Sequence, residues 1–251
     1  KYNCNIYLKR EDLQICRSFK IRGALNKILN LSEIEKHNGI VCASAGNHAQ
    51  GVAFACRYFN VKGYIFMPVT TPQQKIDKTQ AFGGKNIEIK LTGDYFDTTL
   101  RSAISFAKKN RAIFLPPFDS EKVIEGQASV MAEISDQLGS NNAADYIFLA
   151  VGGGGLSSGM LKYAGERGLK TDFRLVEPSG AASLKTALIK KNNVALSKVN
   201  NFVDGAAVAR IGDINFQTLK KFAKNKVLVV PEDRICLTMM ELLNAEGIVL
   251  E

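Results

Sequence analysis

The chain has 251 residues, of which 46% are hydrophobic and 23% are charged, as in an ordinary globular protein. Its length suits one large or two modest domains, and no apolar run approaches the roughly 18 residues that a membrane-spanning helix needs. The formal net charge is +9. The lysines are dispersed in short pairs rather than in a basic stripe with interleaved aromatic residues, so solvated helix faces explain the charge better than a nucleic-acid partner does.

Short apolar runs alternate with helix-like segments along the chain. The pattern predicts strands at 40–43, 64–67, 87–91, 112–115, 146–151, 173–176 and 227–230. It predicts helices at 48–59, from Thr71-Pro72 to Gly83-Gly84, after a cap at Asp94, and at 123–138 with a stop at Gly139. Apolar runs without alternation, each joined to a helix, are typical of parallel strands covered on both faces. We therefore expect an α/β fold, doubly wound, with mostly parallel sheets.

Five cysteines are scattered along the chain without a Cys-x-x-Cys pair, and their odd number argues against a disulfide framework. Buried or unreactive thiols in a reducing cytoplasm are the better interpretation. A zinc site needs clustered cysteines or histidines, and the only histidines are His37 and His48, so we expect no metal. The residues from Lys1 onward lack the apolar segment of a signal peptide. Because the chain does not begin with Met, we expect it to be processed, trimmed or a fragment.

The first predicted helix contains Lys20. Its apolar face has helical spacing and consists of Ile21, Ala24, Leu25, Ile28 and Leu29. Ser18 is a plausible N-cap, which places Lys20 in the first turn. There the positive end of the helix dipole disfavours an ammonium group, and partial burial would lower the pKa of the lysine further. A neutral lysine is what Schiff-base chemistry requires, whereas a solvated surface lysine is the alternative that fits most lysines.

Four glycines, Gly152-Gly153-Gly154-Gly155, follow the strand predicted at 146–151, and Leu156 opens a helix-like stretch. Successive glycines let backbone N–H groups converge on an anion without obstruction by Cβ atoms, and the helix N-terminus adds a field that favours phosphate. A tight turn or a dinucleotide-binding loop is the alternative, although Gly152, Gly154 and Gly159 match the dinucleotide pattern only loosely. A Walker A loop is excluded because no Gly-Lys-Ser or Gly-Lys-Thr follows.

A third segment, Ser44-Ala45-Gly46-Asn47-His48-Ala49-Gln50-Gly51, follows the strand predicted at 40–43. Ser44, Asn47 and the backbone N–H groups of a helix start would bind a carboxylate or a ring oxygen. Alternatively, one of these two side chains would only cap the helix. For His48, a structural or backbone-supplying role is favoured over that of a general base, because no acidic partner stands nearby in the sequence.

In this order, Ser18-Phe19-Lys20-Ile21-Arg22-Gly23, the segment with Asn47 and the glycine run resemble three loops of the threonine dehydratase family. In that family of fold type II pyridoxal 5'-phosphate enzymes, these loops carry the lysine, bind the ring and bind the phosphate. The resemblance runs over nearly the whole chain. It implies a smaller α/β domain at 39–117, inserted into a larger domain that binds pyridoxal 5'-phosphate and consists of 1–38 and 118–251.

The resemblance also implies the role of each site residue. Lys20 would be the catalytic lysine and would form the Schiff base with the cofactor. The residues that would bind the cofactor are Phe19, Lys20, Asn47, Gly152, Gly153, Gly154, Gly155 and Leu156. Asn47 would hold the ring hydroxyl, and the glycines would hold the phosphate. The residues that would bind the substrate are Ser44, Gly46, Asn47 and His48.

The activity implied by the resemblance is β-elimination of L-threonine, and of L-serine as a second substrate. The products would be 2-oxobutanoate or pyruvate, and ammonia. The expected setting is isoleucine biosynthesis in the cytoplasm, by a homo-oligomer that is a tetramer or a dimer. A serine dehydratase or racemase of the same family and a truncated, non-catalytic relative remain as alternatives, followed by a nucleotide-binding Rossmann protein.

The sequence departs from the family pattern in three places. Related serine racemases have a second serine at the position of Ala45, which cannot exchange a proton, so elimination is favoured over racemisation. Those racemases bind a metal through a glutamate and an aspartate six residues on, whereas here Glu177 is followed by Ser183, which would leave Glu177 as a surface carboxylate at a strand end. Segments that the family has before Lys1 and after Glu251 are missing, so we expect exposed apolar surface and sheet edges.

Overall fold

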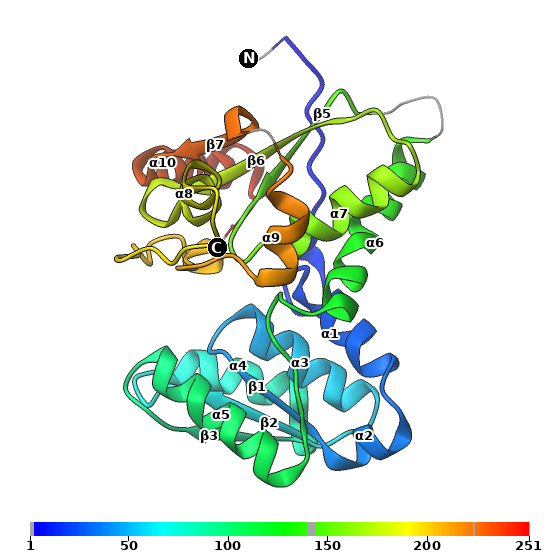
Figure 1. Cartoon of the computed structure of the whole chain (residues 1–251), viewed down its shortest axis with the longest axis vertical. Coiled ribbons are helices and arrows are strands. Elements are labelled where there is room, and N and C mark those ends of the chain that lie inside the picture. Colours follow the sequence, from blue (N-terminus) through cyan, green and yellow to red (C-terminus); the bar gives the residue numbers. More distant parts are fainter. Residues whose placement is uncertain (1–2, 140–143, 223, 251) are drawn as a thin grey trace.

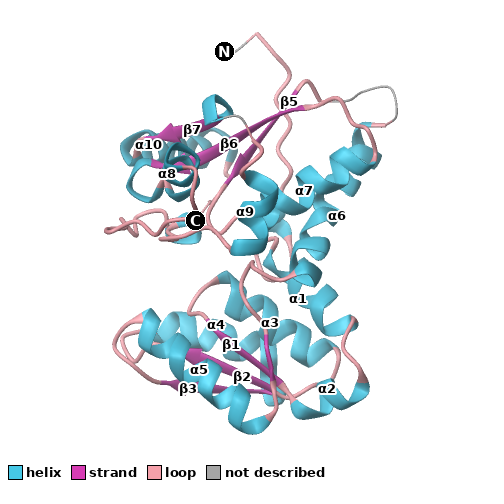
Figure 2. Cartoon of the chain, in the orientation of Figure 1, coloured by secondary structure: helices cyan, strands magenta, loops and turns pink. Residues whose placement is uncertain are grey.

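The computed structural model describes residues 3–139, 144–222 and 224–250. Lys1, Tyr2 and Glu251, which end the predicted larger domain, lie outside these described residues. The chain folds into two lobes, each built on its own parallel sheet, with helix α1 (Lys20–Leu29) between them (Figure 1). Helices and strands alternate through both lobes (Figure 2). The predicted α/β fold with parallel sheets is therefore confirmed, and the domain boundaries at 39 and 117 stay a prediction.

The small lobe contains a four-stranded sheet in the order β3-β2-β1-β4. Its strands are β1 (Ile40–Ala43), β2 (Gly63–Met67), β3 (Ile87–Leu91) and β4 (Ile113–Phe114). Its helices are α2 (Glu33–Asn38), α3 (Asn47–Tyr58), α4 (Gln73–Gly83) and α5 (Phe96–Asn110). All four residues of β1 are buried, because Ile40 and Cys42 share a core with α3 while Val41 and Ala43 share one with α5. Cover on both faces explains why this strand is a continuous apolar run.

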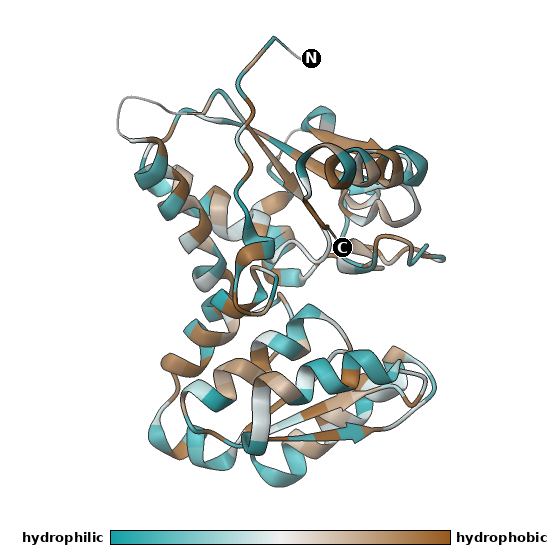
Figure 3. Cartoon of the chain, turned by 180° about the vertical axis from the view of Figure 1, so that it is seen from behind, coloured by the Kyte–Doolittle hydropathy of each residue, from teal (hydrophilic) through white to brown (hydrophobic). Residues whose placement is uncertain are grey.

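The large lobe contains a three-stranded sheet in the order β5-β6-β7. Its strands are β5 (Tyr146–Ala150), β6 (Asp172–Pro178) and β7 (Val227–Val230). Its helices are α6 (Glu121–Leu138), α7 (Gly155–Glu166), α8 (Ser183–Lys190), α9 (Asp213–Leu219) and α10 (Glu232–Glu246). Figure 3 shows hydrophobic stretches in the strands of both sheets, although β3 and β6 also contain charged residues, and the helices are mixed.

Apolar side chains are exposed along one edge of the large lobe. Strand β7 exposes Leu228 and Val229, and α10 contains no buried residue and exposes Leu237, Met240 and Leu243. Within the part of the chain that the structure describes, no helix has both the length and the apolar composition for a membrane crossing.

Helix α1 packs against α3 of the small lobe and α6 of the large lobe. Glycines on α3 and α6 allow both of these helices to pack closely against α1. A Cβ atom on Gly126 of α6 would lie 2.7 Å from the Arg22 carbonyl oxygen, and one on Gly51 of α3 would lie 3.1 Å from the Ile21 nitrogen. Because a larger residue would push these helices apart, the two glycines fix where the first turn of α1 lies.

A charge network ties α1 to its neighbours. Arg22 pairs with Glu11 at 2.8 Å and with Glu133 of α6 at 2.6 Å, and Lys9 also reaches Glu133 at 2.6 Å. The Arg22 side chain is only 10% exposed, so these contacts are less screened than surface ion pairs. The network holds the N-terminal segment, α1 and α6 together.

Three predicted helix starts are wrong. Helix α1 has Phe19 as its N-cap rather than Ser18, because Phe19 is already in a helical conformation with φ −64° and ψ −14°. The Ser18 hydroxyl is buried without a hydrogen-bond partner among the described residues. Helix α4 has Pro72 as its N-cap rather than Thr71. Helix α5 begins at Phe96 with Tyr95 as its N-cap rather than Asp94, because the Gly93 carbonyl accepts a hydrogen bond from the Val69 nitrogen and holds that segment beside β2.

Candidate active site

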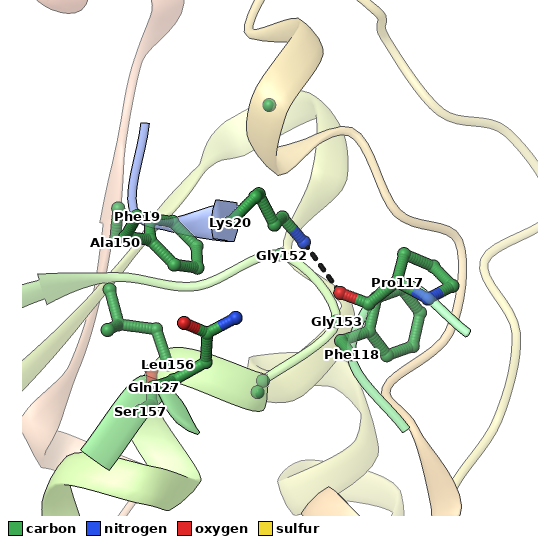
Figure 4. Close-up of a pocket in the computed structure, with 13 residues that line it drawn as sticks. Phe19, Lys20, Pro117, Phe118, Gln127, Ala150, Gly152, Gly153, Leu156 and Ser157 are labelled. Carbon is green, nitrogen blue, oxygen red and sulfur yellow. Dashed lines mark hydrogen bonds between the residues drawn. The ribbon is translucent and has the colours of Figure 1, made fainter. Parts of the chain in front are cut away.

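Lys20 lies in the first turn of α1, as the sequence predicts, and is the first residue of that helix. Its amine lies between two aromatic rings. The Nζ atom is 5.4 Å from the centre of the Phe19 ring and 5.8 Å from that of Phe118, and it donates a hydrogen bond to the Pro117 carbonyl at 2.9 Å (Figure 4). The side chain is half-buried. Burial disfavours the charged form and lowers the pKa of Lys20 to about 8.

The glycine loop, residues 152–155, joins β5 to α7. Two of its positions require glycine. Gly154 has φ +88°, in the left-handed region, and a Cβ atom on Gly153 would lie 2.3 Å from atoms of the Phe118 ring. Helix α7 begins at Gly155 without a side-chain cap, so its first N–H groups are available to an anion.

Asn215 holds the glycine loop against the segment that bears Phe118. It is fully buried, and its Nδ2 donates hydrogen bonds to the Gly153 carbonyl at 3.0 Å and to the Phe118 carbonyl at 3.1 Å. This residue was not predicted from the sequence. Its position in α9 provides no signal, because the contact joins residues 62 positions apart.

One pocket brings together Lys20 and the glycine loop. Its lining includes all the predicted cofactor-binding residues except Asn47, and it also includes Gln127 and Ser157 (Figure 4). The Gln127 Oε1 and Ser157 Oγ atoms are buried and have no hydrogen-bond partner among the described residues. Of these two atoms only the Ser157 hydroxyl can donate, and a free hydroxyl donor beside a loop built for close backbone approach fits a pocket that receives an anionic group.

The asparagine loop, residues 44–51, joins β1 to α3 and is not part of that pocket lining. Helix α3 starts at Asn47 with Gly46 as its N-cap and without a side-chain cap. The alternative in which Ser44 or Asn47 caps the helix is therefore wrong. The Ser44 hydroxyl instead accepts a hydrogen bond from the Gly46 nitrogen at 3.2 Å. The loop approaches the lysine through α3, where Gly51 packs on the Lys20 backbone.

His48 is buried in the first turn of α3, with 4% of its surface exposed. Its Nε2 atom lies 3.0 Å from the Leu115 carbonyl oxygen, to which the Nε2–H tautomer donates. Burial, and secondarily the charge of Lys20, lower the pKa of His48 to about 3. The imidazole is therefore neutral at ordinary pH and is tied to the backbone, which is the geometry of a structural residue.

Glu177 is not a surface carboxylate, so that prediction is wrong. Its side chain is fully buried and accepts hydrogen bonds from the Leu184 nitrogen at 2.7 Å and the Lys185 nitrogen at 2.8 Å, at the start of α8. Burial raises the pKa of Glu177, and these bonds offset part of that effect. Among the residues that the structure describes, no three His, Cys, Asp or Glu side chains are grouped to hold a metal.

All five cysteines are unpaired, and Cys16, Cys42 and Cys56 are buried. Burial raises the pKa of Cys16 and Cys56 to about 12, and that of Cys42 well above its usual value. These three thiols are therefore protonated, and they are poor nucleophiles.

A lysine of lowered pKa, next to a glycine-built anion site at a helix N-terminus, defines an enzyme whose cofactor has a carbonyl group and a phosphate. Residues 1–251 match the family described as pyridoxal-phosphate dependent enzyme. The chain belongs to this family, as the sequence predicts.

Individual relatives agree with this assignment. The chain is 45% identical over 251 residues to the biosynthetic L-threonine dehydratase IlvA of Halalkalibacterium halodurans, and it spans 60% of the length of that protein. The processed threonine deaminase isoform 2 of Solanum lycopersicum superimposes with a TM-score of 0.88 at 39% identity, over 98% of this chain and 69% of that one. The serine racemase of Dictyostelium discoideum gives 0.86 at 29% identity, over 97% and 76%.

Proposed function

We propose that this chain forms the active site of a pyridoxal 5'-phosphate-dependent threonine dehydratase, which converts L-threonine into 2-oxobutanoate and ammonia. L-Serine would be a second substrate and would give pyruvate. The observation that carries the proposal is the pocket that unites Lys20, whose pKa is lowered to about 8, with the glycine loop. The names of the threonine dehydratase and threonine deaminase relatives support the substrate and the place in isoleucine biosynthesis.

The residues present fit the cofactor. The glycine loop and the N-terminus of α7 would hold its phosphate, because the first N–H groups of α7 have no side-chain cap and the backbone at Gly153 and Gly154 packs too closely to accept a side chain. Phe19 and Leu156 supply apolar walls of the same pocket. Asn47, at the start of α3, would bind the ring hydroxyl. When bound, pyridoxal 5'-phosphate delocalises the electron pair that proton removal leaves on the substrate α-carbon.

Lys20 would act first as the point of attachment and then as a base. With a pKa of about 8, about one Lys20 in ten is neutral at pH 7, far more than for an ordinary lysine. The neutral amine can therefore attack a carbonyl, and the released amine can take the α-proton of the substrate. Loss of the β-hydroxyl as water, followed by hydrolysis of the enamine, gives the oxo acid and ammonia.

The asparagine loop would position the substrate. Ser44, Gly46, Asn47 and His48 lie where β1 ends and α3 begins, and α3 has no side-chain cap on its first N–H groups. A carboxylate at that helix N-terminus would gain hydrogen bonds and a favourable helix dipole. His48 would contribute through its backbone, because its imidazole is already bonded to the Leu115 carbonyl.

The first test is the visible absorption spectrum of the chain after addition of pyridoxal 5'-phosphate, followed by an assay for 2-oxobutanoate. We expect a lysine–pyridoxal band and turnover for the parent, and neither for Lys20→Ala. Lys27→Ala, in the last turn of the same helix, is the matched control and should retain both. Turnover by Lys20→Ala at the parent rate would contradict the proposal.

Serine racemisation is the second candidate, because the racemase of Dictyostelium discoideum shares the fold of this chain. Racemisation needs an acid on the face of the α-carbon opposite Lys20. Ala45 packs on the small-lobe core and offers no proton, so we expect pyruvate and no D-serine from L-serine. Measurement of D-serine by chiral chromatography distinguishes the two reactions.

The proposal includes a cytoplasmic homo-oligomer, a tetramer or a dimer, that acts on a small amino acid. It follows from the family resemblance. Light scattering of the purified chain measures the mass of the particle, and a monomer at micromolar concentration would contradict this part.

A further inference from the structure

Gln127 is a buried amide in the wall of the Lys20 pocket, and the proposed function gives it no role so far. It lies on α6, and only 1% of its surface is exposed. Its side-chain amide makes no hydrogen bond to any residue that the structure describes, and the Oε1 atom is sealed from solvent. Figure 4 shows the amide between Phe19 and Ser157, with its nitrogen directed toward the interior of the pocket.

An unpartnered amide is costly at this position. Its neighbours in the pocket wall include Phe19, Leu156 and Ala150, whose side chains offer no hydrogen bond. A methionine or leucine would fill the same volume without losing the hydration of an amide. Oε1 is an acceptor and stays enclosed by the protein, whereas the Nε2 donor faces the pocket and no described residue accepts its hydrogen bond, so it points to an acceptor on the ligand.

The surrounding helices make room for this amide. A Cβ atom on Gly23 of α1 would lie 2.4 Å from Gln127 Nε2, so the absence of a side chain at Gly23 lets the amide lie against the first turn of that helix. The amide is therefore located beside the N-terminus of α1 and near the start of α7, whose Ser157 hydroxyl is also buried and has no partner among the described residues. Two helix N-termini next to the same pocket favour an anion there.

We propose that the amide of Gln127 donates a hydrogen bond to the phosphate group of pyridoxal 5'-phosphate. It is a positioning residue, which adds one side-chain donor to the backbone donors of the glycine loop. This inference rests on the proposed function, because it assigns the anion to the phosphate of that cofactor. The substrate of the enzyme makes no contact with Gln127 in this assignment.

The test separates the phosphate from the rest of the cofactor. The full chain is titrated with pyridoxal 5'-phosphate and, separately, with pyridoxal, which has the same aldehyde and no phosphate. The visible band of the lysine adduct reports binding of both. The variants are Gln127→Met, which keeps the size of the side chain, and Gln127→Glu, which places a carboxylate near the phosphate. Gln137→Met and Gln137→Glu are matched controls, because Gln137 is exposed on the same helix and bonds to Lys9.

We expect Gln127→Met to weaken binding of pyridoxal 5'-phosphate about 10- to 100-fold, the range for a lost hydrogen bond to a charged group. Gln127→Glu should weaken it further, because two anions then face each other. Binding of pyridoxal should change less than about threefold in both variants, because pyridoxal has no phosphate with which Gln127 could form the hydrogen bond. Both controls should bind either compound as the parent does.

Two outcomes overturn the inference. Equal losses for pyridoxal 5'-phosphate and pyridoxal would make Gln127 a packing residue, and unchanged affinity for both would remove any role. Circular dichroism verifies that each variant folds. If Gln127→Glu does not fold, the result for Gln127→Met alone decides between the outcomes. Failure of the proposed function looks different, because the parent would then give no band with either compound. Calorimetric titration of parent and Gln127→Met with inorganic phosphate would still test the inference, and equal affinities would overturn it.

Discussion

The glycine loop and the asparagine loop occupy equivalent places in the two lobes, yet they are held in different ways. Each joins the end of a parallel strand to a helix without a side-chain cap, β5 to α7 and β1 to α3. At Gly153 a Cβ atom would lie 2.3 Å from the Phe118 ring, whereas at Gly46 it would meet no atom within 4 Å. The glycine loop is thus fixed by close backbone packing, and the asparagine loop leaves open space at Gly46.

This difference predicts that the two loops bind different molecules, the glycine loop the cofactor and the asparagine loop the substrate. A loop that tolerates no side chain is suited to a group that binds once and stays, such as a phosphate held by N–H groups. A loop with open space at a helix start is suited to a molecule that enters and leaves in each cycle. The predictions below test this division, in order of decreasing effect.

The largest effect is expected for Gly153→Ala. The added methyl group overlaps the Phe118 ring, and such overpacking destabilises a protein by about 3 kcal/mol. The glycine loop must also shift, so the lysine–pyridoxal band should be lost at micromolar cofactor. Urea unfolding and cofactor titration measure the two effects.

Gly165→Ala is the control for this variant. Gly165 lies in α7, and a Cβ atom there would meet no atom within 4 Å. Alanine favours the helix more than glycine does, so we expect the free energy of unfolding to rise by about 0.5–1 kcal/mol and cofactor binding to stay normal. Equal behaviour of the two variants would show that the packing of the glycine loop does not matter.

The next largest effect on stability is expected for Lys20→Met, measured on the chain without cofactor. An ordinary lysine has a pKa of 10.5, whereas the pKa of Lys20 in the fold is about 8, so the unfolded chain binds more protons between these pH values. The stability of the parent therefore rises with pH through this window, and below pH 8 the parent bears the full cost of a buried ammonium. Lys20→Met avoids that cost and should be more stable at pH 7, by on the order of 2–3 kcal/mol.

The measurement is urea unfolding of parent and Lys20→Met from pH 7 to pH 10. The difference between them should shrink as the pH rises above 8. Lys27→Met, measured in parallel, shows how pH affects the rest of the chain. A difference that stays constant over this range would mean that the amine of Lys20 is not desolvated in the fold.

Asn215→Leu tests the support of the glycine loop. The substitution removes the donors to the Gly153 and Phe118 carbonyls and leaves both acceptors without these bonds. We expect the free energy of unfolding to fall by about 2 kcal/mol, and cofactor binding to weaken because the glycine loop is held less firmly. Asn110→Leu is the control, since Asn110 is exposed and its side chain donates to the Phe106 carbonyl. Similar losses in both variants would show that the buried bonds of Asn215 are not special.

The sequence predicted the parts of the site that depend on consecutive residues. Four glycines after an apolar strand indicate an anion loop, and the apolar face around Lys20 places it at a helix start. Asn215 and Gln127 were not predictable in this way. Their roles depend on contacts with Gly153 and Gly23, which only the folded chain brings near.

Local patterns also failed where tertiary contacts compete with them. Asp94 has the chemistry of an N-cap, but the backbone bond between Gly93 and Val69 delays the helix until Phe96. Glu177 has the charge of a surface residue, but two backbone N–H groups of α8 compensate its burial. Each error arises because burial and distant hydrogen bonds are not encoded in neighbouring residues.

The smallest effect on stability is expected for Gly46→Ala, the counterpart of Gly153→Ala in the asparagine loop. Gly46 has φ −124° and is the N-cap of α3. Alanine is a poorer N-cap than glycine but reduces the entropy of the unfolded chain, and these opposite terms leave a change within about 0.5 kcal/mol. The methyl group would project into the open space at the helix start, where the substrate carboxylate would lie.

Gly46→Ala should therefore bind the cofactor normally and raise the KM for L-threonine about tenfold, the loss expected for one weakened hydrogen bond to a charged group. Cofactor titration and steady-state kinetics on the same preparation measure both quantities. A loss of cofactor binding like that of Gly153→Ala would show that both loops serve the cofactor. An unchanged KM would place the carboxylate elsewhere, and the open space at Gly46 would then have no part in substrate binding.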